Sequence, residues 1–283
     1  MARILGGITT SHIPAVGNAI QNKLYDDPYW KPFFDGYPKV HAWIDEHKPD
    51  YVINIYNDHG LGFFLDRMPT FAIGAAHEYR NEDEGWGLPA LDPFPGAPEL
   101  SWHIIESLVA DEFDITSCQE LAVDHGFVVP MQLFWPNAPH HPHMPKAVPI
   151  SANTVQHPIP TLNRALNFGK ALRKALLSFP EKDAKIVVLG TGGLSHQLDG
   201  QRAGFINKEF DQYCLENIVH NPEELTKITR QELVKNAGAQ GTEFLMWMMM
   251  RGALGDDVTE VTRNYHIPIS NTAAGTLLLE CAA

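Results

Sequence analysis

The chain has 283 residues, of which 44% are hydrophobic and 19% are charged. These fractions are typical of a folded globular protein and argue against a disordered one. The formal net charge of -13 at pH 7 argues against nucleic acid and anionic membranes as partners, because an acidic surface is repelled by both.

The three cysteines, Cys118, Cys214 and Cys281, lie far apart and form no C-x-x-C pair. This spacing argues against a disulfide framework or a zinc ribbon. The N-terminal segment does not have the layout of a signal peptide, and the apolar runs are too short to cross a bilayer. We therefore expect a cytoplasmic protein with reduced thiols and no membrane span.

Strand-like and helix-like segments alternate along the chain. Short runs rich in Val and Ile, bounded by turn residues, predict strands over residues 3–8, 51–56, 70–73, 147–150, 185–189 and 276–279. Apolar residues at helical spacing predict helices over residues 40–47, 98–111, 160–178, 207–218, 222–236 and 242–254. The proline-containing stretches 82–98 and 136–146 predict loops. This alternation indicates an α/β fold, with a central mixed β-sheet covered by helices in a single domain.

Four of the 14 histidines stand out by their place in this pattern. His12, His59 and His196 each follow a predicted strand, where the carboxyl ends of strands line the ligand crevice of an open α/β sheet. His125 has a similar setting between a loop and an apolar run. By contrast, the His140, His141 and His143 cluster lies in a proline-rich loop, which is poorly suited to fixed coordination geometry.

Imidazole binds iron and zinc alike, so the third ligand discriminates between the two metals. A carboxylate would complete the facial triad of a non-haem iron site, and Glu243 is a candidate at the start of a predicted apolar helix. An acid there is also favourable to the helix dipole without any metal. Asp58 and Asp124 are rivals beside two of the histidines, although they fit hydrogen-bonding or turn roles better because adjacent side chains diverge.

Eight ordered segments resemble the class III extradiol dioxygenases, most closely the catalytic β subunits of protocatechuate 4,5-dioxygenases. These segments are TTSHIP, YNDHG, DEGWG, VDHG, GTGGLSHQL, INKEFD, MRGAL and YHIPISNTA. The resemblance extends from the first predicted strand nearly to the last residue, so it implies one extradiol dioxygenase catalytic domain over residues 1–283.

The resemblance implies a metal site with three ligands. It makes His12, His59 and Glu243 the residues that bind Fe(II), and it makes His196 the catalytic acid and base. It also makes His125 a second catalytic histidine close to the substrate.

Ser270 and Asn271, in the ISNTA segment, match the pair that holds the substrate carboxylate in the family. The reaction implied is cleavage of a catechol-type aromatic acid by O2 beside its two hydroxyls. Protocatechuate, which would give 4-carboxy-2-hydroxymuconate semialdehyde, is the expected substrate, with gallate or 3-O-methylgallate as alternatives. No lid domain is expected in this chain, so the resemblance implies a small α-type partner subunit or a homo-oligomer that closes the site.

Two other classes of function stay open at this point. A zinc-dependent hydrolase can use the same histidines and carboxylate, because zinc accepts both ligand types. A non-catalytic metal-binding subunit is the other alternative, although His196 beside the ligands argues against it through the resemblance.

Overall fold

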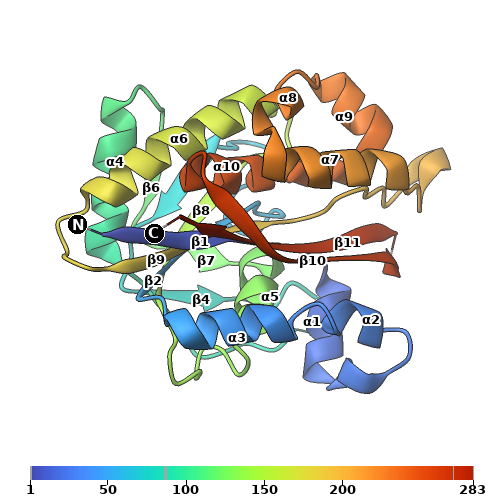
Figure 1. Ribbon diagram of the computed structural model, residues 1–283, viewed down its shortest axis with the longest axis horizontal. Helices are drawn as coiled ribbons and strands as arrows, with labels where there is room; N and C mark the ends of the chain where they lie inside the picture. Colours follow the sequence, from blue (N-terminus) through green and yellow to red (C-terminus); the bar gives the residue numbers. More distant parts are fainter. Residues whose placement is uncertain (1, 86–87, 270, 283) are drawn as a thin grey trace.

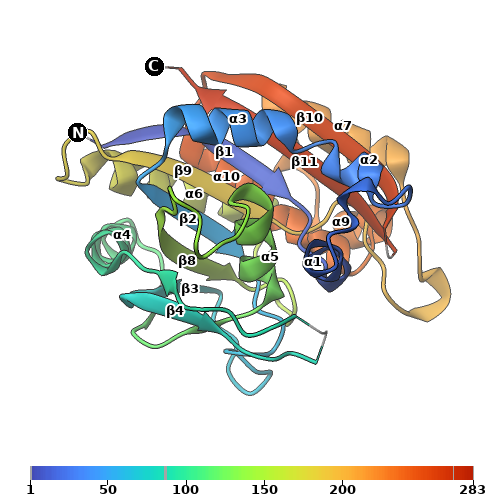
Figure 2. The ribbon, with the colours of Figure 1, turned by 90° about the horizontal axis from the view of Figure 1, so that it is seen from below.

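The computed structural model describes residues 2–85, 88–269 and 271–282. Its centre is formed by four parallel strands that lie side by side (Figure 2). In spatial order they are β1 (Arg3–Thr10), β9 (Lys185–Thr191), β2 (Tyr51–Tyr56) and β8 (Lys146–Ala152). Because these strands are parallel, their carboxyl ends lie at the same edge of the sheet.

Antiparallel pairing extends this centre on both sides into an eight-stranded mixed sheet. On one side, β11 (Thr272–Cys281) pairs with β1, and β10 (Val258–Ile269) pairs with β11 as the edge strand. On the other side, β3 (Phe71–Gly74) pairs with β8, followed by β6 (Thr116–Cys118) in parallel with β3. A small second sheet holds β4 (Glu78–Asn81), β5 (Phe94–Pro95) and β7 (Ala122–Val123).

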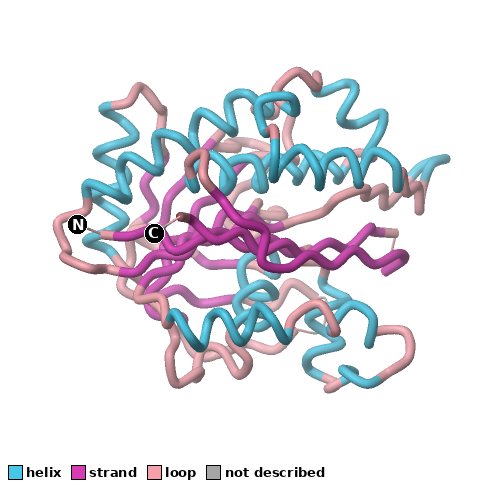
Figure 3. Tube along the Cα trace, viewed as in Figure 1, coloured by secondary structure: helices cyan, strands magenta, loops and turns pink. Residues whose placement is uncertain are grey.

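Helices cover both faces of the large sheet (Figures 1 and 3). One face carries α4 (Pro98–Ala110), α6 (Leu162–Ser178), α7 (Lys208–His220), α8 (Pro222–Leu225), α9 (Arg230–Ala237) and α10 (Phe244–Leu254). The opposite face carries α1 (Pro14–Gln21), α2 (Lys31–Phe34), α3 (Pro38–His47) and α5 (His125–Phe134). Three short 3₁₀ turns, η1 (Leu24–Asp26), η2 (Gly200–Arg202) and η3 (Gln240–Glu243), join some of these elements.

Alternating side chains of the central strands build one hydrophobic core on each face. In β2, Ile53 and Ile55 belong to one core, whereas Val52 and Tyr56 belong to the other. This two-sided burial explains why the predicted strands are nearly continuous apolar runs. Helix α10 is buried along its whole length, which explains its apolar sequence on all sides. The expected α/β fold with a mixed sheet covered by helices is confirmed.

The structure also departs from the predicted elements. The strand β10 and the helix α5 are not predicted, and the predicted helix over residues 222–236 is two helices, α8 and α9. Within the described residues, none of the helices combines the length and the apolar character needed to cross a membrane.

Candidate functional site

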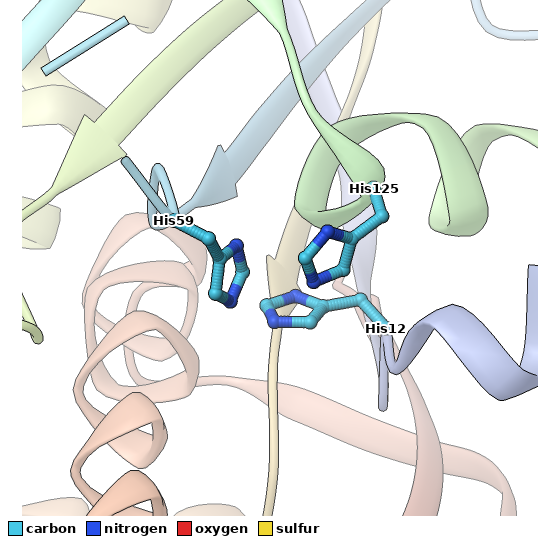
Figure 4. Close-up of side chains that lie close together, drawn as sticks. All are labelled: His12, His59 and His125. Atoms are coloured by element: carbon cyan, nitrogen blue, oxygen red, sulfur yellow. The ribbon is translucent and has the colours of Figure 1, made fainter. Parts of the chain in front are cut away.

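The carboxyl edge of the parallel strands brings the predicted histidines together. His12 and His59 lie just beyond β1 and β2, His196 lies in the loop after β9, and His125 begins α5. The rings of His12, His59 and His125 face one another (Figure 4). These three side chains line a cavity of about 410 Å³ together with His196 and Glu243. A cavity of this size suits a small aromatic ligand.

Three of the histidines and Glu243 are close enough to share one metal ion. The nitrogens offered by His12, His59 and His125 lie within 4.8 Å of one another. The Glu243 Oε2 atom lies 3.6 Å from His12 Nε2, and its Oε1 atom lies 3.8 Å from His59 Nε2. These distances bring together the residues of the predicted triad, but they place His125 beside it as well.

The proton on His12 is positioned by Thr191, the last residue of β9. The Thr191 hydroxyl donates to the carbonyl oxygen of Ile55 at 3.1 Å and lies 3.0 Å from His12 Nδ1. His12 Nδ1–H therefore donates to Thr191, which leaves the lone pair on Nε2. Burial lowers the pKa of His12 more than the carboxylate of Glu243 raises it. His12 Nε2 is buried and has no hydrogen-bond partner within the described part of the chain, as expected of a metal ligand.

His59 is held by Asp124 through both its backbone and its ring. The Asp124 Oδ2 atom accepts from the His59 backbone N–H at 2.7 Å and from the ring Nδ1–H at 2.8 Å. Burial alone would lower the pKa of His59, but Asp124 and Glu243 raise it to about 10. Burial would likewise raise the pKa of Asp124, but His59 lowers it to about 2. A carboxylate on Nδ1 with Nε2 turned to the site is the usual arrangement of a metal-bound histidine.

Glu243 brings a second buried negative charge to the site. Burial raises its pKa, but the interactions with the nearby imidazoles of His12 and His59 outweigh burial and hold the pKa well below the usual value. Its Oε2 atom accepts from the Gly193 backbone N–H at 2.9 Å. The adjacent Gly192 has a φ of 102°, and a Cβ there would lie 2.6 Å from the Cβ of Glu243, so this close approach requires glycine.

This donor set fits a divalent cation. Asp124 and Glu243 both remain ionised although they are buried, and a buried charge is costly unless it is compensated. The lone pair of His12 Nε2, the ring of His59 and the carboxylate of Glu243 converge, and a dication between them would satisfy all three groups. Two imidazoles with one carboxylate suit Fe(II).

A second cluster, formed by Glu84, Asp124 and His125, also has metal-like composition. Its carboxylate oxygens, however, are already used as hydrogen-bond acceptors. Glu84 accepts from the His125 backbone N–H at 2.7 Å and from the ring Nδ1 at 2.6 Å, while Asp124 accepts from His59 and from the Gly126 N–H. This cluster therefore orients the histidines rather than binding a metal of its own.

His196 differs from the other three histidines. Among the described residues, neither of its ring nitrogens has a hydrogen-bond partner, although the residue is only 5% exposed. Its backbone is fixed, because its N–H donates to Ala237 and its carbonyl oxygen accepts from Gln240 and Gly241. Burial lowers the pKa of the ring. The neutral ring is thus held on a firm backbone with both nitrogens free to exchange a proton.

The loop before His196 is tied to a buried carboxylate. The Asp211 Oδ1 atom accepts from the backbone N–H and the hydroxyl of Ser195, at 2.9 and 2.8 Å. The Tyr265 hydroxyl donates to the other oxygen of Asp211 at 2.7 Å. Helix α7 and strand β10 thereby hold the loop that carries His196 in place.

The predicted substrate-binding pair is described only in part. Ser270 lies outside the described residues. Asn271 is exposed at the turn between β10 and β11, and it is not among the described residues that line the cavity. Its neighbour Thr272 pairs with the backbone of His196, so Asn271 lies close to the site along the chain.

Three residues of the site were not singled out from the sequence. Thr191 is signalled by its place at the end of a strand that precedes a glycine turn. Glu84 lies in the DEGWG segment of the family resemblance, but nothing in this acidic loop separates it from its neighbours. Asp211 ends the INKEFD segment, and on an amphipathic helix it has the pattern of a surface acid, although it is buried. Asp58, a rival ligand by sequence, instead accepts from four backbone N–H groups of the turn that follows it.

Comparisons with known proteins agree with this geometry. A gallate dioxygenase of Pseudomonas putida is 41% identical over 198 residues, which cover 70% of this chain and 57% of that protein. A 2,3-dihydroxyphenylpropionate/2,3-dihydroxicinnamic acid 1,2-dioxygenase of Photorhabdus laumondii is 28% identical over 82% of this chain and 68% of its own length. The chain thus spans little more than half of the gallate dioxygenase.

One solved structure is similar to this chain in fold but not in sequence. An uncharacterized protein of Escherichia coli K12 superposes with a TM-score of 0.57 at 12% identity, over 98% of this chain and 100% of that one. The model of one family, the catalytic LigB subunit of aromatic ring-opening dioxygenase, matches residues 6–275. The chain therefore belongs to the LigB family of catalytic subunits of aromatic ring-opening dioxygenases.

Proposed function

We propose that this protein is an Fe(II)-dependent extradiol dioxygenase that opens the ring of an aromatic acid with two adjacent hydroxyls. The observation that carries the proposal is the convergence of His12, His59 and Glu243 at the wall of one cavity in a chain of the LigB family. These three residues are the proposed iron ligands. His125, the fourth candidate by distance, is assigned to the substrate, because the close approaches described for Glu243 are to His12 and His59 rather than to His125.

The reaction breaks the ring bond beside the two hydroxyl carbons, and both atoms of O2 enter the product. It therefore needs no external reductant. When bound, Fe(II) supplies the redox centre through which electrons pass from the ring to O2. The protein supplies orientation of the ring in the cavity and groups that move protons.

His196 is the proposed acid and base. Its lowered pKa keeps the ring neutral near pH 7, so a ring nitrogen can take the proton of a substrate hydroxyl and return it later in the cycle. The absence of described hydrogen-bond partners on its ring leaves both nitrogens available for this exchange. His125, which also lines the cavity, is proposed to bind a substrate hydroxyl or oxygen.

Among the expected substrates, the comparisons favour gallate over protocatechuate, because the relative with 41% identity is a gallate dioxygenase. The LigB match and the residues that line the cavity fit either acid. The proposed role of Ser270 and Asn271 in holding the substrate carboxylate applies to both acids as well, since both carry this group.

Oxygen uptake after anaerobic loading with Fe(II) tests the substrate. We expect uptake with gallate, with a kcat/KM at least about 10-fold above that for protocatechuate, because a site built for an additional hydroxyl loses hydrogen bonds when the hydroxyl is missing. 3-O-Methylgallate, which replaces a hydroxyl by a methoxy group, serves as the matched comparison. Faster turnover of protocatechuate would contradict the ranking, and failure of all three acids would contradict the proposed function.

A further inference from the structure

Glu84 contacts His125 at two points, although it belongs to an irregular segment far from α5 in the sequence. Its Oε1 atom accepts from the His125 backbone N–H at 2.7 Å, and its Oε2 atom lies 2.6 Å from the ring Nδ1. The side chains of Glu84 and His125 are 10% and 5% exposed. The pair is thus shielded from water, where hydrogen bonds to a charged group are strong.

The contact repeats the arrangement seen at Asp124 and His59. There too, one carboxylate accepts from both the backbone N–H and the ring Nδ1 of a single histidine. The two rings stack with their centroids 4.0 Å apart and their planes at 28°. His125 is therefore oriented as firmly as the proposed ligand beside it, although it is not itself a proposed ligand.

The chemistry of the contact determines where the ring proton lies. An ionised carboxylate only accepts hydrogen bonds, so His125 Nδ1 must carry the proton. In the neutral ring, the lone pair is then on Nε2, which is the nitrogen left for the cavity. The opposite tautomer would place a lone pair of Nδ1 against the negative charge of Glu84.

We propose that Glu84 is a positioning residue that holds the proton of His125 on Nδ1, so that Nε2 accepts a hydrogen bond from a substrate hydroxyl. The proton position follows from the Glu84 contact alone, whereas the hydroxyl as the donor rests on the proposed function. The two cavity histidines that are not proposed ligands then have different roles. His125 is a fixed acceptor, and His196, whose ring has no partner among the described residues, moves the proton.

The variant Glu84→Gln distinguishes this role from simple packing. Glutamine has nearly the same shape, but it offers one acceptor and one donor in place of two acceptors. The backbone N–H of His125 cannot give up its proton and keeps the amide oxygen, so the amide NH2 faces Nδ1. We expect the ring proton to move to Nε2, which turns the cavity-facing nitrogen from an acceptor into a donor.

Glu82→Gln is the matched control. It removes the same charge from the same segment, but the side chain of Glu82 is exposed. Thermal melting of both variants shows whether the fold is kept.

The ring proton is measured directly by ¹⁵N NMR of the histidine side chains in the metal-free protein, as the pH is raised until the His125 ring carries a single proton. The signal of His125 is assigned by its loss in His125→Asn. We expect Nδ1–H in the wild type and in Glu82→Gln, and Nε2–H in Glu84→Gln. An Nε2–H in the wild type, or an unchanged tautomer in Glu84→Gln, would overturn the proposal. The wild-type spectrum alone tests the position of the His125 proton, even if the variant does not fold.

Kinetics of the iron-loaded enzyme test the second part of the proposal, that His125 Nε2 accepts a hydrogen bond from the substrate. We expect Glu84→Gln to bind iron as the wild type does and to lose roughly 10–100-fold in kcat, since loss of an orienting partner has effects of that size. An inverted tautomer with unchanged kcat and KM would refute the acceptor role. If the wild type turned over none of the acids, the proposed function would fail, while the NMR result on Glu84 would stand by itself.

Discussion

Replacing Glu243 by glutamine should abolish tight binding of Fe(II) and, with it, turnover. Glutamine keeps the shape of the side chain and an oxygen for the Gly193 N–H, so the fold is expected to survive. The negative charge that faces His12 and His59 is lost, however, and a neutral amide is a weak ligand for a dication. Removing one partner of a buried ion pair costs roughly 3–5 kcal/mol, which corresponds to an affinity loss of about 100-fold or more.

The measurement is iron per chain after anaerobic loading and desalting, together with oxygen uptake. Glu223→Gln is the control, because Glu223 pairs with Lys170 at the exposed surface and its loss should change neither quantity. A Glu243→Gln protein with one iron per chain and normal turnover would show that the carboxylate is not a ligand.

Replacing His196 by alanine should leave iron binding intact and reduce kcat by roughly 10²–10⁴-fold, the usual contribution of a general acid or base. The described contacts of His196 are made by its backbone, so the substitution leaves no buried partner unsatisfied. The proposed ligand atoms of His12, His59 and Glu243 are untouched. This variant therefore separates the proton-transfer role from metal binding.

The control for this variant is His220→Ala, at the exposed end of α7, where the side chain is 72% exposed. Substrate-induced changes in the spectrum of the iron-loaded protein report binding independently of turnover. Loss of iron from His196→Ala would assign His196 to the metal instead, and full activity would show that the ring is not needed.

The positions of the site histidines could be predicted because they follow from sheet geometry. Parallel strands that end at one edge bring His12, His59 and the loop of His196 together without any detail of packing. The same argument could not divide the roles among these histidines. All three histidines have the same position at a strand end, so this position does not distinguish ligand from acid and base. What distinguishes them is hydrogen bonding from distant parts of the chain: Thr191 contacts the ring of His12, and Asp124 contacts the ring of His59.

Glu243 shows the limit of local patterns. Its position before an apolar helix is equally typical of an acid that only stabilises the helix dipole. Its proximity to two histidines depends on the path of the Gly192 turn against it, which is a tertiary contact. The resemblance to a family selected it correctly as a neighbour of the histidines, and its role as a ligand stays a prediction.

Two of the elements that were not predicted, β10 and α5, show different reasons for the failure. The edge strand β10 carries charged and polar residues along much of its length, so its apolar signal is weak. Helix α5 contains Pro130 and adjacent valines, which disfavour a helix. Burial of nearly the whole segment outweighs this preference. Pro130 has no N–H to donate to the Gly126 carbonyl oxygen, and the Thr191 hydroxyl lies 3.4 Å from that oxygen instead.

Several expectations from the sequence are not tested by the described contacts. The assignment of residues 1–283 to one catalytic domain stays a prediction, as does a small α-type subunit or homo-oligomer that closes the cavity. The expectation that the His140, His141 and His143 loop is not a metal site also stays a prediction. The ring centroids of His141 and His143 lie 6.3 Å apart.

Isotope labelling shows whether this site inserts both atoms of O2 into an aromatic acid. The Fe(II)-loaded protein is given gallate under ¹⁸O₂, and the ring-opened product is analysed by mass spectrometry. We expect two heavy oxygen atoms in each product molecule, and no labelled product when Fe(II) is replaced by Zn(II). A product that carries one heavy oxygen or none, or equal turnover with zinc, would contradict it.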